Sequence, residues 1–107
     1  MPYVLVILRG GENDADDELH APAHRQFISS LIRRNLVLLG GALAEPLGDV
    51  YAAYVLRCSG AEEARALVAD DPFVIHDVVR PECVEWELVG INPDAVEASA
   101  VVRPKDV

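Results

Sequence analysis

The chain has 107 residues, the usual size of one domain, so it can bury one hydrophobic core and not two. Its 18 Asp and Glu residues outnumber its 9 Lys and Arg residues and give a formal net charge of −9. Such a surface repels phosphate groups, which argues against nucleic acid or an anionic membrane as a partner. Apolar residues make up 51% of the chain, so we expect a folded protein and not a disordered one.

The first apolar run, residues 3–9, is predicted to form a β-strand because it is rich in β-branched and aliphatic side chains. It is much shorter than the roughly 20 residues of a membrane span, and no basic leader of the kind found in signal peptides precedes it. We therefore expect a cytoplasmic protein with no membrane partner. Residues 10–18 are mostly Gly, Asp and Glu and predict a solvated loop.

A helix and a strand are predicted next. Apolar residues recur at three-and-four spacing over residues 22–35, which predicts an amphipathic helix whose first turn holds its proline. On this interpretation His20 lies just outside the helix. Residues 36–44 follow as a strand bent at Gly40-Gly41, and residues 45–49 supply a turn.

The second half of the chain begins with a third predicted strand, residues 50–58. A second helix is expected over residues 59–69, because Ser59 and Glu62 have the spacing of a capping box. The Asp-Asp-Pro sequence at residues 70–72 is expected to end this helix.

The remaining residues complete one domain. Residues 73–80 predict a turn or a helical stub, and residues 82–89 predict a last strand. The order strand, helix, strand, strand, helix, strand is that of a ferredoxin-like α+β sandwich, with both helices on one face of an antiparallel sheet. Residues 1–90 would form this domain, and residues 91–107, which lack periodicity, a C-terminal tail.

The predicted strands are apolar on both faces. Residues 4–8, 36–39 and 50–56 are apolar or aromatic at nearly every position, whereas a strand with one face in water alternates polar and apolar residues. A second copy of the chain, packed sheet to sheet about a two-fold axis, would cover the open face. The sequence therefore predicts a homodimer.

Two residues are candidates for acid-base chemistry. His24 lies on the apolar stripe of the first helix, so its imidazole needs a partner, either a backbone carbonyl in the core or a group in an active site. Asp71 precedes a proline, where it can simply shape a turn. If the end of the second helix lies beside the start of the first, Asp71 can instead pair with His24.

Other residues have weaker claims to a site. Arg9 ends the first strand, and it can hold an anionic substrate oxygen or lie on the surface. Phe73 and Trp86 can wall a pocket or pack in the core or at a dimer interface. His76 is a further substrate-binding candidate, and its alternative is an exposed polar residue in a turn.

A metal site is not expected. His20 and His24 have a spacing that can chelate a metal, but no third ligand is near them in the sequence, and His76 can join them only through the fold. We therefore predict neither a metal nor another cofactor.

The order of these motifs resembles that of the YCII-related family over about residues 1–90. The resemblance rests on His24, Gly40-Gly41-Ala42, Gly48, Ser59-Gly60-Ala61-Glu62-Glu63-Ala64, Asp71-Pro72-Phe73 and Val84-Glu85-Trp86. It implies a dimeric α+β barrel, a catalytic pair at His24 and Asp71, and activity such as lyase-type elimination on an oxygenated aromatic ring. The acidic residues 12–18, His20, His76 and the tail are not part of the shared pattern, so it implies no particular substrate.

Three functions remain open at this point. The first is a cofactor-independent lyase or isomerase in which His24 moves a proton and Asp71 orients it. The second is a non-catalytic dimer that binds a small ligand or a partner, with His24 as a polar anchor. The third, a cofactorless or haem-linked oxygenase, is disfavoured because no residue beyond His24 offers an axial ligand.

Overall fold

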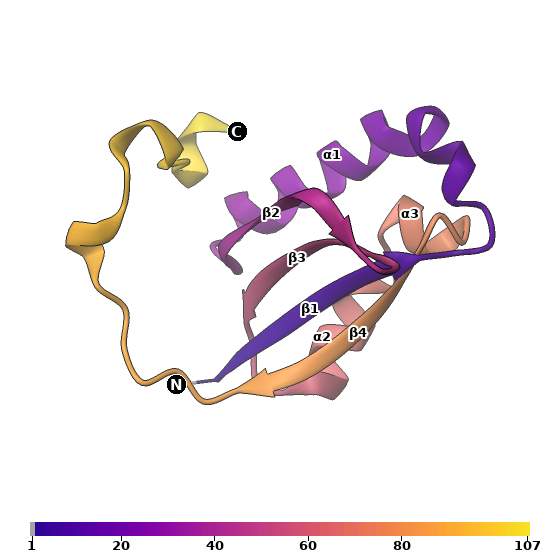
Figure 1. The fold of residues 1–107 in the computed structure, drawn as a ribbon. Coiled ribbons are helices and arrows are strands. Elements are labelled where there is room, and N and C mark those ends of the chain that lie inside the picture. Colours follow the sequence, from indigo (N-terminus) through magenta and orange to yellow (C-terminus); the bar gives the residue numbers. More distant parts are fainter. Residues whose placement is uncertain (1) are drawn as a thin grey trace.

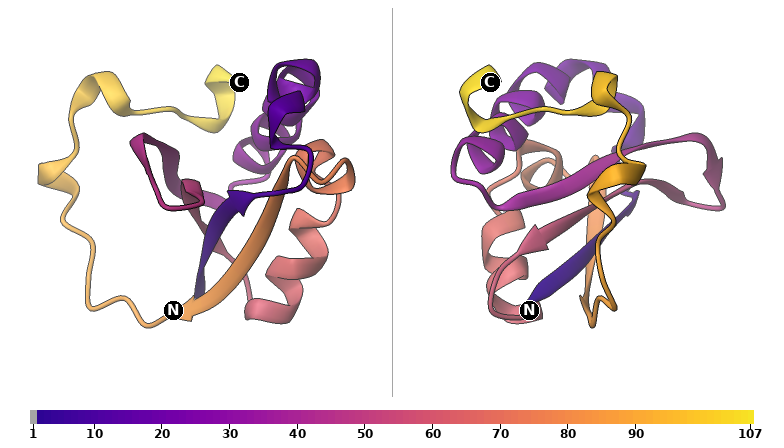
Figure 2. Two further views of the ribbon diagram at one scale, coloured as in Figure 1. Left: turned by 45° about the vertical axis from the view of Figure 1, so that its right-hand side comes forward. Right: turned by 90° about the vertical axis from the view of Figure 1, so that its left-hand side faces the viewer.

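The computed structural model describes residues 2–107 and contains one antiparallel sheet with its helices on one side (Figures 1 and 2). The sheet has four strands in the order β2-β3-β1-β4, and each neighbouring pair is antiparallel. The strands are β1 (Tyr3–Gly10), β2 (Val37–Leu47), β3 (Val50–Arg57) and β4 (Val79–Trp86). The helices are α1 (Asp17–Arg33), α2 (Ala61–Val68) and α3 (Pro72–Ile75). This arrangement is the predicted ferredoxin-like α+β fold.

The core lies between the sheet and the helices. Val4, Val6 and Leu8 alternate along β1 as buried side chains, so one face of this strand packs inward. Leu31 of α1 and Leu56 of β3 are fully buried in the same cluster. Alternation along the strands thus fixes which face of the sheet holds the core.

The opposite face of the sheet carries no helix (Figure 2), and we call it the bare face; it is apolar around Trp86, at one end of β1 and β4. Strand pairing sets Tyr3 opposite Trp86 and Leu5 opposite Val84 on this face. Trp86 and Val84 remain 45% and 43% exposed. The bare face therefore keeps the apolar character that the sequence indicated for both sides of the strands.

The first helix begins earlier than predicted. α1 starts at Asp17, so His20 lies within it and the expectation that it lies outside is wrong. Asp17 and Glu18 in the first turn favour a helix start here, because carboxylates stabilise the positive end of the helix dipole. Pro22 removes only a hydrogen bond to the carbonyl of Glu18, a residue exposed to water.

The second helix has a different cap from the predicted one. α2 begins at Ala61 with Gly60 as its N-cap, not at Ser59. The carboxylate of Glu63, not of Glu62, accepts from the Ser59 backbone N–H at 2.8 Å and also from the Ser59 hydroxyl. The Glu63 side chain thus closes back on Ser59, the residue before the N-cap.

Two strand boundaries also differ from the prediction. β2 continues to Leu47, so the turn before β3 is only Gly48-Asp49, with Gly48 at a φ of 59° that favours glycine. β4 spans Val79–Trp86, three residues earlier than expected, because it pairs along the whole of β1. Pro81 is tolerated there because β4 is an edge strand.

The C-terminal tail leaves the sheet at the end of β4 and arches over the side opposite the helices (Figure 2). It contains short 3₁₀ turns, and the last of them, Pro104–Asp106, contacts α1. Across residues 2–107, no helix has the length and hydropathy needed to cross a membrane.

Candidate active site

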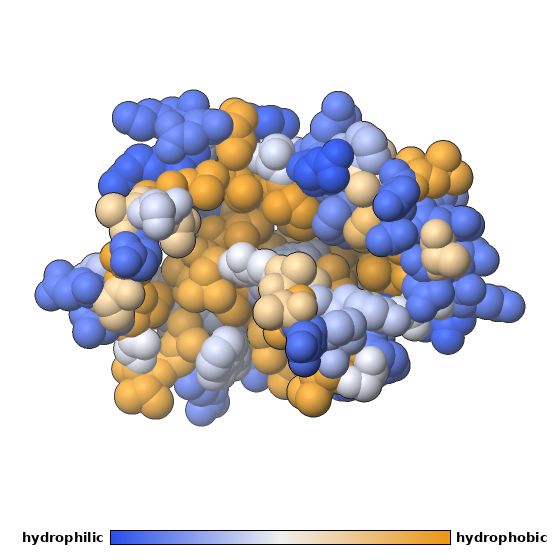
Figure 3. Space-filling model, turned by 45° about the horizontal axis from the view of Figure 1, so that its top comes forward, coloured by the Kyte–Doolittle hydropathy of each residue, from blue (hydrophilic) through white to orange (hydrophobic). Residues whose placement is uncertain are grey.

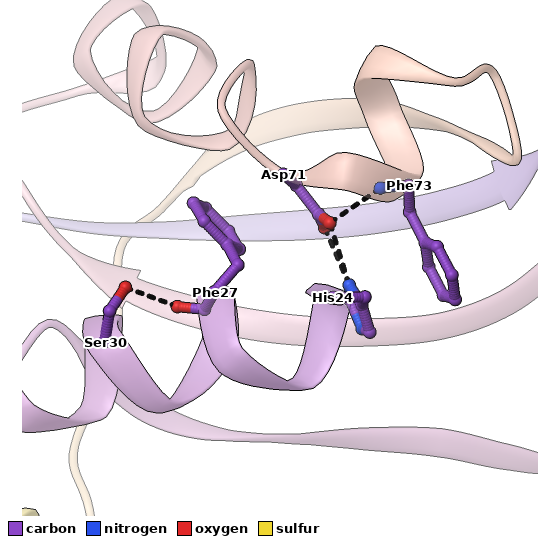
Figure 4. Close-up of polar contacts among 5 residues, drawn as sticks. All are labelled: His24, Phe27, Ser30, Asp71 and Phe73. Carbon is purple, nitrogen blue, oxygen red and sulfur yellow. Dashed lines mark hydrogen bonds and ion pairs between the residues drawn. The ribbon is translucent and has the colours of Figure 1, made fainter. Parts of the chain in front are cut away.

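The packing of α1 against α3 brings His24 and Asp71 together, although they are 47 residues apart in the chain. Nδ1 of His24 lies 2.9 Å from Oδ1 and 3.0 Å from Oδ2 of Asp71 (Figure 4). The contact that the sequence permitted is therefore present.

Asp71 is held rigidly because it also caps a helix. It is the N-cap of α3, and its Oδ1 accepts from the backbone N–H of Phe73 at 2.9 Å. The side chain is fully buried, with 0% exposure. A buried carboxylate is stable only when such donors satisfy it, so the cap and the imidazole together keep Asp71 in place.

The hydrogen bond to Asp71 determines the tautomer of the His24 imidazole. An ionised carboxylate only accepts hydrogen bonds, so Nδ1 carries the proton, and in the neutral ring the lone pair is then on Nε2. Among residues 2–107 nothing hydrogen-bonds Nε2, and the His24 side chain is 20% exposed. Nε2 is thus the atom of this pair that a bound molecule can reach.

Phe73 fixes the plane of the imidazole. Its ring stacks on that of His24 with centroids 4.0 Å apart and planes 6° from parallel (Figure 4). Asp71 therefore holds the edge of the imidazole and Phe73 holds its face. Such fixed orientation favours a proton-transfer group over a mobile surface histidine.

A cavity of about 1000 Å³ adjoins the pair, lined by α1, β2, β3, α3 and the tail. His24 and Phe73 line it, and most other side chains there are apolar. Figure 3 shows apolar side chains gathered in a hollow with hydrophilic residues around it. The apolar lining includes Ile28 and Ile32 from α1, Leu38 and Leu39 from β2, Ala52 and Tyr54 from β3, and Ile91, Val96, Val101 and Val102 from the tail.

Tyr54 is a cavity residue that the sequence did not single out. Its hydroxyl is buried and has no hydrogen-bond partner among residues 2–107. Burial raises the pKa of this hydroxyl far above its usual value, and the charge of Asp71 adds to the effect. A Cβ on Gly40 would overlap the Tyr54 Cβ, so the glycine allows β2 to lie this close to Tyr54. The glycine bend was the one signal in the sequence, but its partner on β3 follows only from the strand register.

Arg9 lies outside the cavity lining, and its guanidinium already forms ion pairs with two carboxylates. It bonds to Asp49 at 2.8 Å and to Glu82 at 3.0 Å, and these bonds, first that to Glu82, raise the pKa of its guanidinium. It is not among the cavity-lining residues. The structure therefore does not bring Arg9 to the place where it would hold a substrate oxygen.

Trp86 and His76 also lie outside the cavity lining. Trp86 is on the bare face of the sheet. His76 ends α3 and stacks on His20 with centroids 4.0 Å apart. Across residues 2–107 no group of three or more potential ligands is placed to hold a metal ion.

Neither a protein-family model nor a curated protein sequence matches the chain. Among solved structures it is similar to 5-chloro-2-hydroxyhydroquinone dehydrochlorinase (TftG) from Burkholderia phenoliruptrix AC1100, in a complex with 2,5-dihydroxybenzoquinone. The TM-score is 0.60 at 16% identity, and the match covers 78% of this chain and 93% of the other. At this identity the similarity shows a shared fold.

Proposed function

We propose that this chain is a small-molecule enzyme of the YCII-related type that catalyses a lyase or isomerase reaction with His24 as the proton-transfer group. The observation that carries the proposal is the contact of His24 Nδ1 with the fully buried Asp71 at the wall of a large apolar cavity. A histidine that only filled a core would not need an oriented ring, a buried carboxylate and an open cavity together.

In an elimination of this kind, His24 Nε2 removes a proton from the bound substrate. The electron pair left behind forms a new π bond, and the leaving group departs with its own bonding pair. Asp71 stabilises the imidazolium that forms and keeps the ring in the productive tautomer. An isomerase reaction uses the same group and returns the proton at another atom, so neither reaction needs an oxidant or a metal.

The similarity to TftG supports the lyase form of the proposal. A dehydrochlorinase removes hydrogen and chlorine from its substrate, and that protein is complexed with a dihydroxybenzoquinone, a small oxygenated ring. A ring of this size fits easily within the cavity described here. We carry over the reaction type and the class of ligand, but no residue roles, at 16% identity.

The proposal includes a homodimer formed through the bare face of the sheet. Trp86 and Val84 are half exposed there beside Tyr3 and Leu5, and a second copy would remove these apolar side chains from water. A cytoplasmic location stays a prediction from the sequence.

The test compares wild type, His24→Ala and His20→Ala on a panel of chlorinated and unchlorinated hydroxyhydroquinones, with chloride release and quinone absorbance as readouts. His20 is on the same helix but does not line the cavity, so it is the matched control. His24→Ala should lower kcat by about 10²- to 10⁴-fold, while His20→Ala stays near wild type.

Circular dichroism should show that both variants are folded. A fully active His24→Ala would overturn the proposed role of the histidine. A wild type that binds members of the panel but converts none would favour the alternative, a non-catalytic dimer that binds small ligands.

A further inference from the structure

The charged groups that line the cavity are all of one sign. Carboxylates of Asp14, Asp17, Glu18 and Glu97 belong to its lining, and no Lys or Arg among residues 2–107 does. They come from separate segments, the 3₁₀ turn before α1, the first turn of α1, and the tail. The cavity is therefore acidic because of the residues that line it, and not only because the chain as a whole carries a net negative charge.

Most of these carboxylates have no cation to balance them. Asp14 accepts a hydrogen bond from the Tyr51 hydroxyl at 3.3 Å, and the pKa of Tyr51 is raised first by the charge of Asp14 and then by burial and this bond. Asp17, Glu18 and Glu97 form no salt bridge among residues 2–107. Asp71 is not among the lining residues, and its carboxylate is bonded to His24.

The arginines that form ion pairs do so elsewhere. Arg9 bonds to Asp49 and Glu82, and Arg80 bonds to Asp77 at 3.0 Å. An anionic ligand in the cavity would thus meet several carboxylates and no guanidinium. These four lining carboxylates are exposed to water, so they repel such a ligand at the mouth of the cavity and weaken its binding, and salt screens this repulsion.

The rest of the lining suits a flat, apolar body. The Phe73 ring stacked on His24 and the ring of Tyr54 provide aromatic surface, and aliphatic side chains from α1, β2 and the tail surround them. The buried Tyr54 hydroxyl has no partner and leaves one donor beside this surface unsatisfied.

We propose that the cavity selects neutral or cationic aromatic compounds and excludes those that carry a carboxylate. This inference rests on the proposed function only in taking the cavity as the substrate site. It deepens that function, because it restricts the substrate to the uncharged or positively charged members of its class. It also replaces the expectation that Arg9 holds an anionic oxygen.

The test uses three para-substituted phenols that differ mainly in the charge of the side chain. 4-Ethylphenol is neutral, tyramine is a cation, and 3-(4-hydroxyphenyl)propionate is an anion at pH 7. Binding to the full-length wild type is measured by protein-observed NMR titration at low and high salt. The anion should bind at least about ten-fold more weakly than the neutral phenol, tyramine should bind at least as well as the neutral phenol, and salt should reduce the differences.

A double variant, Asp17→Asn with Glu18→Gln, tests the source of the selectivity. It should improve binding of the anion several-fold, weaken binding of tyramine, and change the neutral phenol least. Glu62→Gln is the control for loss of a carboxylate elsewhere on the surface, because Glu62 is exposed in the first turn of α2 and does not line the cavity. It should leave the order of the three phenols unchanged.

Three results would overturn the inference. They are an anion that binds as tightly as the neutral phenol, a double variant that behaves like Glu62→Gln, and the absence of measurable binding by all three compounds at millimolar concentration. Because binding needs no turnover, the selectivity can hold even if the enzyme assays on His24→Ala overturn the catalytic proposal. Failure of one is therefore distinguishable from failure of the other.

Discussion

Two polar clusters in this chain use similar groups in opposite surroundings. Arg9 bonds to Asp49 and Glu82 on exposed strand ends, where its side chain keeps 40% exposure. His24 bonds to Asp71, which has 0% exposure and also caps α3. Water screens the first cluster, so its bonds are worth little, whereas the second cannot lose a partner without leaving a buried group unsatisfied. Burial beside a cavity, and not the number of charges, marks the second as the functional candidate.

Of the substitutions proposed for the two clusters, removal of Asp71 should lower the stability of the protein most. Asp71→Ala deletes the cap of α3 and the partner of His24 in the core, and it should cost about 3 kcal/mol of unfolding free energy. Asp71→Asn keeps an acceptor and should cost less, in both stability and turnover. Thermal unfolding of the two variants measures the difference, and an Asp71→Ala protein as stable as wild type would break the distinction between the clusters.

The next largest effect is expected from a substitution on the bare face of the sheet, which also carries the exposed Arg9 cluster. Alternation along β1 and β4 sets Arg9 and Glu82 on the same face as Trp86. Trp86→Glu should convert the proposed dimer to monomers at micromolar concentration, because it introduces a carboxylate into the apolar interface. Sedimentation velocity checks this result. A wild type that is monomeric throughout the concentration range would contradict the proposed dimer.

Removal of the unpartnered Tyr54 hydroxyl should have a smaller effect, an increase in stability instead of a loss. Tyr54→Phe keeps the ring that packs against Gly40 and removes a buried group without a hydrogen bond, so it should raise stability by about 1 kcal/mol. Denaturant unfolding measures this gain. If the variant is instead less stable than wild type, the hydroxyl has a partner in solution that stabilises the fold.

The smallest effect is expected at Arg9 itself. Arg9→Met keeps the length of the side chain and removes only exposed ion pairs, so Tm should change by less than about 3 °C. Affinity for 4-ethylphenol should stay at the wild-type value, because Arg9 does not line the cavity. A large loss of affinity in this variant would show that Arg9 belongs to the site after all.

Local patterns in the sequence predicted most of the fold. Runs of apolar and β-branched residues identified the strands, because strands covered on both faces are apolar at nearly every position. Three-and-four spacing identified the long helix, because a helix buries one stripe of side chains. The predicted start of α1 is five residues too late. Pro22 fits the first turn of a helix, but the acidic residues before it stabilise a helix start at Asp17. The extent of β4 was missed because its pairing with β1 sets its ends.

The site was harder to predict because its parts come from distant segments. The face of the helix indicated that His24 points inward, but its contact with Asp71 depends on how α1 packs against α3. Tyr54 and the tail residues Val101 and Val102 join the cavity only through strand register and the path of the tail. No periodicity marks such residues, so only the three-dimensional structure assigns them.

The most direct test of the proposed pair is the tautomer of His24, read from a long-range ¹H–¹⁵N NMR spectrum of the labelled protein at alkaline pH. The hydrogen bond to Asp71 predicts a protonated Nδ1 and an unprotonated Nε2 in the neutral ring. Addition of 4-ethylphenol should then shift the Nε2 resonance, because this nitrogen is the one available to a ligand. A neutral ring protonated at Nε2, or an Nε2 resonance unmoved at saturation, would contradict the proposed site.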